Sequence, residues 1–106
     1  MRLRRIVMPK TARAGTIVTI RALIAHPMLR GHNSPTNPRP RRIVHTFTVH
    51  FGDREIFRAE LFPGVAANPQ FVIQTMVTET GEFRFTWTED GGKTAVETRN
   101  LDVLPQ

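Results

Sequence analysis

The chain has 106 residues, of which 40% are hydrophobic and 23% charged, and it contains no cysteine. This length supports one hydrophobic core, so we predict a single domain over residues 1–106. Without cysteine, the chain has no disulfide, no thiolate metal site and no thiol nucleophile. No apolar stretch approaches the roughly 20 residues of a membrane-spanning helix, so we expect no membrane contact.

The net charge of +6 is unevenly distributed along the chain. Residues 1–42 contain ten Arg or Lys and no Asp or Glu, whereas residues 43–106 contain five Arg or Lys and nine Asp or Glu. Such asymmetry favours an acidic partner for the basic part. A solvated basic edge that keeps the chain soluble and monomeric is the alternative.

The first half of the chain predicts two strands and a long irregular connection. Residues 3–8 indicate a short strand ended by Pro9, and residues 10–15 indicate a turn. Residues 16–26 are rich in β-branched side chains, with the alternating apolar positions Val18, Ile20, Ala22 and Ile24 on one face. Residues 27–41 contain four prolines, which exclude a helix or a central strand. Connections of this length are usually functional or mobile.

The central stretch, residues 42–62, predicts a β-hairpin. Apolar residues recur at Ile43, Phe47, Val49 and Phe51, and Gly52 supplies the tight turn. An isolated hairpin is unstable in water, so it needs a partner sheet.

Three further strands are expected over residues 70–78, 83–88 and 93–104. Turn-rich connections precede them over residues 63–69, 79–82 and 90–92. Phe83, Phe85 and Trp87 give the clearest two-residue alternation. About seven short strands without a convincing helix predict an all-β, immunoglobulin-like two-sheet antiparallel sandwich.

The residues usual in nucleophilic or metal catalysis are scarce. Ser34 is the only serine, and it lies in the proline-rich connection without the context of an activated nucleophile. His26, His32, His45 and His50 show no metal-binding spacing, so we expect structural roles for them.

The carboxylates also favour a surface role over an active site. We expect Glu55 and Glu60 on opposite faces of their strand, and Glu89 and Asp90 at a solvated turn. The sequence therefore indicates a binding module and not an enzyme, with no cofactor and no metal.

Nucleic-acid binding is a second hypothesis. Arg30, Arg39, Arg41 and Arg42 could neutralise phosphates. The aromatic residues, however, alternate inward on strands, as core residues do, and tyrosine is absent. We therefore expect no nucleic-acid partner, and keep a basic polyanion-binding sandwich as the alternative.

Several blocks together resemble a known family. They are His26-Pro27-Met28, Pro40 to Phe47, Glu55 to Leu61, Pro63 to Pro69 and Thr80 to Trp87. In this order and spacing, over roughly residues 5–104, they are similar to the SoxZ family, the smaller subunit of the SoxYZ carrier of bacterial sulfur oxidation. The Ala67-Asn68-Pro69 and Gly81 to Trp87 blocks are the most specific.

The resemblance implies an immunoglobulin-like sandwich that forms a heterodimer with SoxY. In the family, a C-terminal cysteine arm of SoxY carries the sulfur substrate between enzymes in the periplasm. SoxZ has no chemistry of its own there, and the Sox enzymes meet the carrier transiently. Family members commonly lack a signal peptide and are thought to cross the membrane bound to SoxY. This sequence likewise shows no apolar leader after its basic N-terminus, because Pro9 and Lys10 interrupt it.

The connection over residues 29–40 departs from the family pattern. The family usually carries an Arg-Asp pair and a Gly-Lys there, whereas this stretch has no acidic residue. A SoxYZ-like carrier subunit associated with quinoprotein dehydrogenases is therefore a further alternative.

Nine residues are candidates for partner binding. Four are apolar side chains left over once one core face is filled, and second-sheet core is their alternative: Phe57, Leu61, Phe62 and Met76. Five lie in the two long loops, where docking of enzymes competes with ordinary exposure: Met28, Arg30, Arg41, Arg42 and Asn68. The arginines would also suit an anionic sulfur cargo. Self-association of the isolated chain, if it occurs, is expected through the surface meant for the partner.

Overall fold

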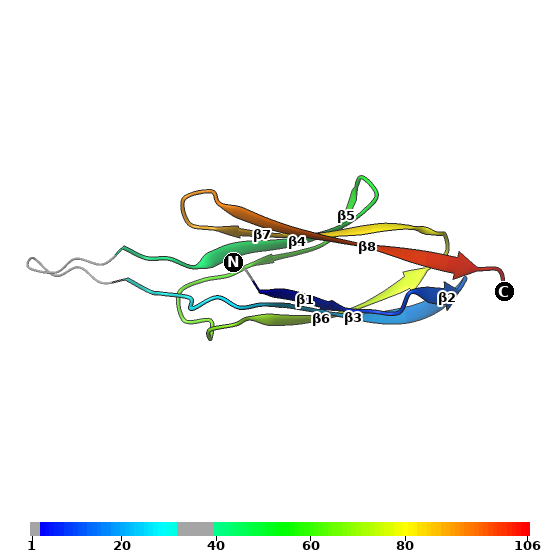
Figure 1. Cartoon of the computed structure of the whole chain (residues 1–106), viewed down its shortest axis with the longest axis horizontal. Coiled ribbons are helices and arrows are strands. Elements are labelled where there is room, and N and C mark those ends of the chain that lie inside the picture. Colours follow the sequence, from blue (N-terminus) through cyan, green and yellow to red (C-terminus); the bar gives the residue numbers. More distant parts are fainter. Residues whose placement is uncertain (1–2, 32–39) are drawn as a thin grey trace, which may run out of the picture.

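A computed structural model describes residues 3–31 and 40–106 of the chain (Figure 1). It contains eight strands: β1 (Arg4–Val7), β2 (Thr11–Arg13), β3 (Thr16–Ile24), β4 (Val44–Phe51), β5 (Arg54–Glu60), β6 (Gln70–Val77), β7 (Gly81–Glu89) and β8 (Thr94–Leu104). Three residues discussed above, His32, Ser34 and Arg39, lie outside the described residues. The described residues contain no helix of the length and hydropathy that a membrane span needs.

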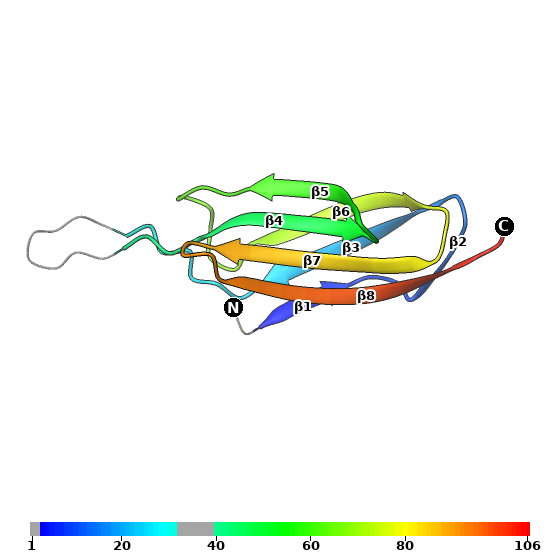
Figure 2. The same cartoon turned by 90° about the horizontal axis from the view of Figure 1, so that it is seen from above.

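The strands form two sheets that pack face to face, as Figures 1 and 2 show. One sheet has three strands in the order β1-β3-β6, and the other has five in the order β2-β8-β7-β4-β5. All neighbours are antiparallel except β2 and β8, which run parallel. The predicted all-β, two-layer sandwich is therefore confirmed.

The core lies between the two sheets, where alternate residues of each strand point inward. Phe47 of β4 stacks on Phe71 of β6 across the layers, with ring centroids 4.6 Å apart, and contacts Trp87 at 5.1 Å. The predicted inward set of β3 is buried, as are Phe83, Phe85 and Trp87 of β7. The hydrophobic alternation thus identifies the core correctly.

The expected turn over residues 10–15 is wrong in part, because it contains strand β2. The chain leaves the three-stranded sheet after β1 and joins the five-stranded sheet, where Thr11 pairs with Asp102 and Arg13 with Leu104. This exchange raises the strand number from the expected seven to eight. At the edge of the larger sheet, β2 thus pairs with the last three residues of β8.

The expectation for Glu55 and Glu60 is also wrong. The β4–β5 register shifts beyond Val49, so that Phe57 pairs with Val49 but Glu55 pairs with His50. The extra residue of such a bulge reverses the alternation. Glu55 and Glu60 consequently share the outer face, where Arg58 binds both carboxylates at 3.0 Å.

Candidate partner-binding site at one end of the sandwich

Four segments meet where β3 and β7 end and β4 begins, at the left end of Figure 1. They are residues 25–31, 40–43 and 61–69 and the turn over residues 89–93. Seven of the nine candidate residues belong to these segments: Met28, Arg30, Arg41, Arg42, Leu61, Phe62 and Asn68. The sandwich thus brings together two loops that lie far apart in the sequence.

A buried histidine joins three of these segments. His26 is 2% exposed, and its Nδ1 accepts a hydrogen bond of 3.0 Å from the backbone N–H of Met28. Because Nδ1 accepts, the ring proton lies on Nε2, which donates to Glu89 Oε2 at 2.7 Å. The structural role predicted for His26 is confirmed by these contacts.

Glu89 is buried, which corrects the expectation of a solvated turn. Burial raises the pKa of Glu89, but the His26 hydrogen bond and the nearby charges of Arg42 and Lys93 outweigh it, so the pKa lies below its ordinary value. The carboxylate therefore stays ionised at neutral pH. Arg42 Nε lies 3.5 Å from its second oxygen.

Asn68 locks the second loop onto the same histidine through the backbone. Its side-chain oxygen accepts the N–H of His26 at 2.9 Å, and its own N–H donates to the His26 carbonyl at 2.8 Å. Asn68 has a φ of +55°, a left-handed conformation that asparagine tolerates better than most residues. Asn68, a candidate for partner binding, therefore positions the second loop.

Met28 has a similar φ of +53°, which is uncommon for a residue with a long side chain. Its side chain is only 6% exposed and lies in the core, where Val44 N–H points at the sulfur at 3.3 Å. Such a backbone costs about 1–3 kcal/mol and persists only where its surroundings hold it. Met28 therefore shapes the loop base and offers little surface to a partner.

Asp90 holds the segment that leads into β4. Arg41 donates to both its oxygens, at 2.9 and 2.7 Å, and Ile43 N–H donates at 3.0 Å. These donors, led by Arg41, lower the pKa of Asp90. Leu29 and Arg42 close the loop base with two backbone hydrogen bonds of 2.7 Å. Two of the three candidate arginines are therefore paired with carboxylates of the same chain.

Two of the four apolar candidates lie in strands, Phe57 in β5 and Met76 in β6, whereas Leu61 and Phe62 directly follow β5. Leu61 is buried in the core, and Phe57 is half-buried with its ring 6.0 Å from those of Phe47 and Phe71. Phe62 and Met76 are 68% and 62% exposed. Of the four, Phe62 and Met76 present a free apolar surface. Phe57 and Leu61 pack in the core, which was the alternative to partner binding.

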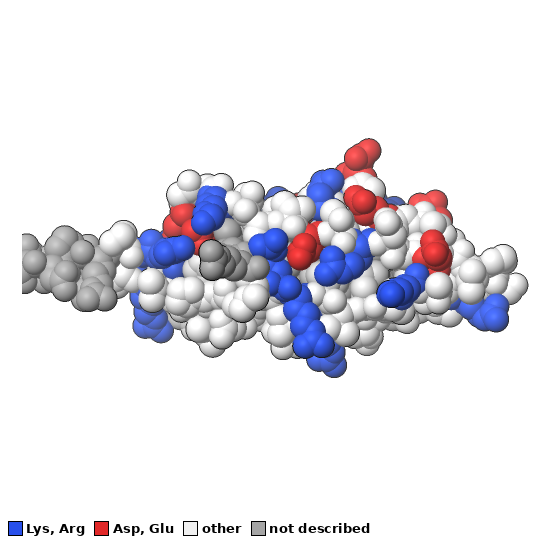
Figure 3. Space-filling model, viewed as in Figure 1, with Lys and Arg blue, Asp and Glu red and all other residues white. Residues whose placement is uncertain are grey.

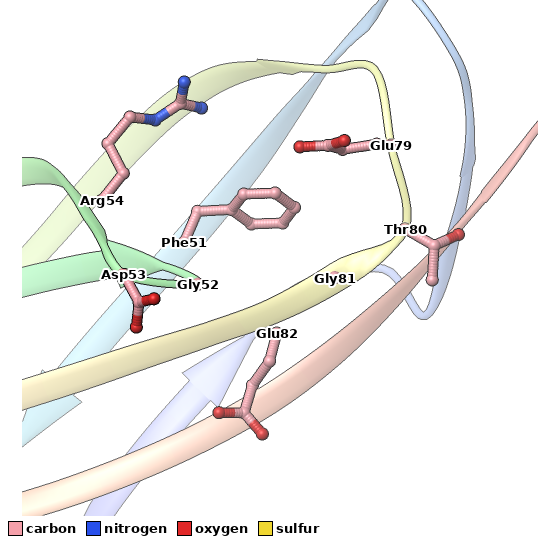
Figure 4. Close-up of a pocket in the computed structure, with 8 residues that line it drawn as sticks. All are labelled: Phe51, Gly52, Asp53, Arg54, Glu79, Thr80, Gly81 and Glu82. Atoms are coloured by element: carbon pink, nitrogen blue, oxygen red, sulfur yellow. The ribbon is translucent and has the colours of Figure 1, made fainter.

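A separate hollow of about 590 Å³ lies at the opposite end, beside the turns after β4 and before β7 (Figure 4). The ring of Phe51 lines it, next to Gly81. Arg54 and Glu79 extend on one side of the ring, and Asp53 points away. Within residues 3–31 and 40–106, no three His, Asp or Glu side chains form a group that could hold a metal ion.

Comparison with known proteins decides the family. A family profile described as sulphur oxidation protein SoxZ matches residues 5–100. The chain belongs to the SoxZ family. This confirms the resemblance found in the sequence, and it makes the chain a sulfur-oxidation protein. No curated protein matches the sequence.

Solved structures share the SoxZ sandwich. The sulfur carrier protein SoxY from Chlorobium limicola f thiosulfatophilum is 13% identical, with a TM-score of 0.71 over 98% of this chain and 81% of that one. Superoxide reductase (neelaredoxin) from Ignicoccus hospitalis is 15% identical, with a TM-score of 0.73 over 95% of this chain and 80% of that one. At these identities the likeness shows the fold alone.

Proposed function

We propose that this SoxZ-family chain is the non-catalytic subunit of a sulfur-substrate carrier in the periplasm. It binds a SoxY-like subunit and presents that subunit to Sox enzymes during thiosulfate or sulfur oxidation. The family match over residues 5–100 is the observation that carries the proposal. The absence of cysteine supports it, because a chain without a thiol cannot hold sulfur as a thiol adduct.

The geometry supports a positioning role for the end of the sandwich around His26. Buried polar groups that are fully hydrogen-bonded make a rigid base. That base holds Arg30 and Arg41 at the surface, where enzymes that meet the carrier could contact them. Since Arg41 and Arg42 are paired with Asp90 and Glu89, they contribute less free positive charge to an anionic cargo than their number suggests.

Reconstitution tests this function. Thiosulfate-dependent turnover is measured with the Sox enzymes and the SoxY-like subunit, with and without this chain. We expect turnover only when the chain is present, and no turnover of thiosulfate, sulfite or sulfide by the chain alone. Full turnover in its absence, or turnover by the purified chain without a companion, contradicts the proposal.

A further inference from the structure

The face of the β1-β3-β6 sheet that points away from the core carries several exposed apolar side chains. Ile17 pairs with Met76 across β3 and β6, and Val7, Arg21 and Val72 form a row across all three strands. Ile17, Met76 and Val72 are 63%, 62% and 54% exposed. The polar Thr19–Gln74 pair lies between the Ile17–Met76 pair and this row. Exposed large apolar side chains gathered on one face are typical of an interaction surface.

The same face is cationic and carries no acid. None of the three strands contains Asp or Glu, whereas Arg5 and Arg21 point outward beside the apolar row. In the part of the chain that the structure describes, neither arginine forms an ion pair. Along the lower edge of Figure 3, where this sheet lies, Lys and Arg side chains appear without Asp or Glu.

The outer face of the five-stranded sheet differs in both respects. Threonines pair across its strands β4 and β7: Thr48 pairs with Thr86, and Thr46 pairs with Thr88. Its Arg58 is neutralised by Glu55 and Glu60. This face is therefore richer in hydroxyl groups and also carries acidic side chains, so the two outer faces are not equivalent.

We propose that the outer face of the β1-β3-β6 sheet is the surface on which the SoxY-like subunit docks. The partner surface that fits it has apolar side chains flanked by carboxylates. This inference rests on the proposed function and adds the place and chemistry of the contact. Charge complementarity selects the partner, because a second copy of this chain would bring Arg5 and Arg21 against the same arginines with no acid between them.

The size of the face sets the extent of the contact. A strand of nine residues at about 3.3 Å per residue is about 30 Å long, and three strands about 4.8 Å apart are about 14 Å wide. The resulting area of about 400 Å² is half of the ~800 Å² that each partner usually buries. The contact must therefore extend beyond the sheet.

An adjoining hollow of about 410 Å³ provides that extension. Arg5 and Leu23 line it and also belong to the outer face, and Leu3, 73% exposed, forms part of its wall. Asn68 also lines it. A subunit seated on the sheet and in this hollow thus reaches the histidine-centred end of the sandwich.

Charge placed on the face tests the proposal. The dissociation constant for the SoxY-like subunit is measured for the wild-type chain and for Met76→Glu and Arg21→Glu. We expect each substitution to weaken binding at least tenfold, because a carboxylate then meets an apolar or acidic surface. For Arg21→Glu, the salt dependence of the association rate should also become shallower.

Two variants serve as matched controls. Val96→Glu places the same charge at an exposed apolar position on the other outer face, and Arg84→Glu reverses an outward-pointing charge of β7 on that face. Both are expected to bind within twofold of wild type. Thermal unfolding confirms that all four variants are folded, since none of them changes a core side chain.

The outcomes separate this inference from the proposed function. If the wild-type chain does not bind the SoxY-like subunit, the proposed function fails and this inference with it. If the wild-type chain binds and Met76→Glu and Arg21→Glu bind equally well, only the docking face is wrong. Self-association of the wild-type chain that Met76→Glu abolishes, or tight binding of duplex DNA that Arg21→Glu abolishes, also overturns the docking face.

Discussion

The hydrogen bonds of His26 show how single residues set the shape of the candidate site. One ring nitrogen holds the backbone of Met28 and the other holds Glu89, while Asn68 binds the His26 backbone. The sequence contained a signal for Glu89, because it continues the inward series Phe83, Phe85 and Trp87. The neighbouring turn signal, Asp90-Gly91-Gly92, masked it. Local turn chemistry and strand alternation conflicted there, and the alternation was correct.

Removing the Glu89 carboxylate should destabilise the fold. Glu89→Ala leaves the buried Nε2–H of His26 without an acceptor, which costs about 2–3 kcal/mol in the free energy of unfolding. Glu82→Ala, at an exposed position on the same strand, should cost less than about 0.5 kcal/mol. Urea unfolding monitored by circular dichroism measures both. Equal destabilisation by the two substitutions would show that the pair contributes nothing specific.

The lowered pKa values of Glu89 and Asp90 predict loss of stability in acid. A carboxylate whose pKa is lower folded than unfolded stabilises the fold above its unfolded pKa, and this contribution disappears as the pH falls through the folded value. The free energy of unfolding should therefore decline below about pH 4.5, the ordinary pKa of glutamate.

The variant Glu89→Gln assigns part of this pH dependence to the buried group. Glutamine keeps an acceptor for His26 but cannot be protonated, so the decline between pH 5 and pH 3 should be smaller than in wild type. Denaturant unfolding at a series of pH values provides the comparison. Identical slopes for the two proteins would rule out Glu89 as a contributor.

At the scale of the strands, hydrophobic alternation predicts most elements and tertiary pairing decides the rest. The long strands β3 and β7 follow from their apolar period, since each has nine residues with a buried face. Strand β2 has only three residues and exists through its parallel pairing with β8, more than 80 residues away. The bulge that brings Glu55 beside Arg58 leaves no mark in a two-residue pattern.

The close packing of two turns gives a prediction at this scale. A Cβ at Gly81, where β7 begins, would collide with the ring of Phe51 at the end of β4. Gly81→Ala should therefore cost about 1–3 kcal/mol, as overpacking does. In the Phe51→Ala background the same substitution should cost almost nothing, because the obstructing ring is gone. A double-mutant cycle by urea unfolding tests this, and additive costs would contradict it.

At the scale of the whole molecule, the two outer faces of the sandwich have different chemistry. Strand number and the Trp87-centred core predict the sandwich itself. The sequence also shows that the first 42 residues lack acids, which favoured an acidic partner. It could not place the docking face, because Ile17 and Met76 become neighbours only through the pairing of β3 with β6. Met76 was predicted as a partner-binding residue. Ile17, Val7 and Val72 on the same face were not predicted.

The stoichiometry of the complex provides a direct test of the proposed heterodimer. Sedimentation velocity of this chain mixed with a SoxY-like subunit, at micromolar concentration and physiological salt, measures the mass of what forms. We expect one species with the mass of a 1:1 heterodimer, formed at the expense of both free subunits. Two independent boundaries at the masses of the separate chains would contradict it.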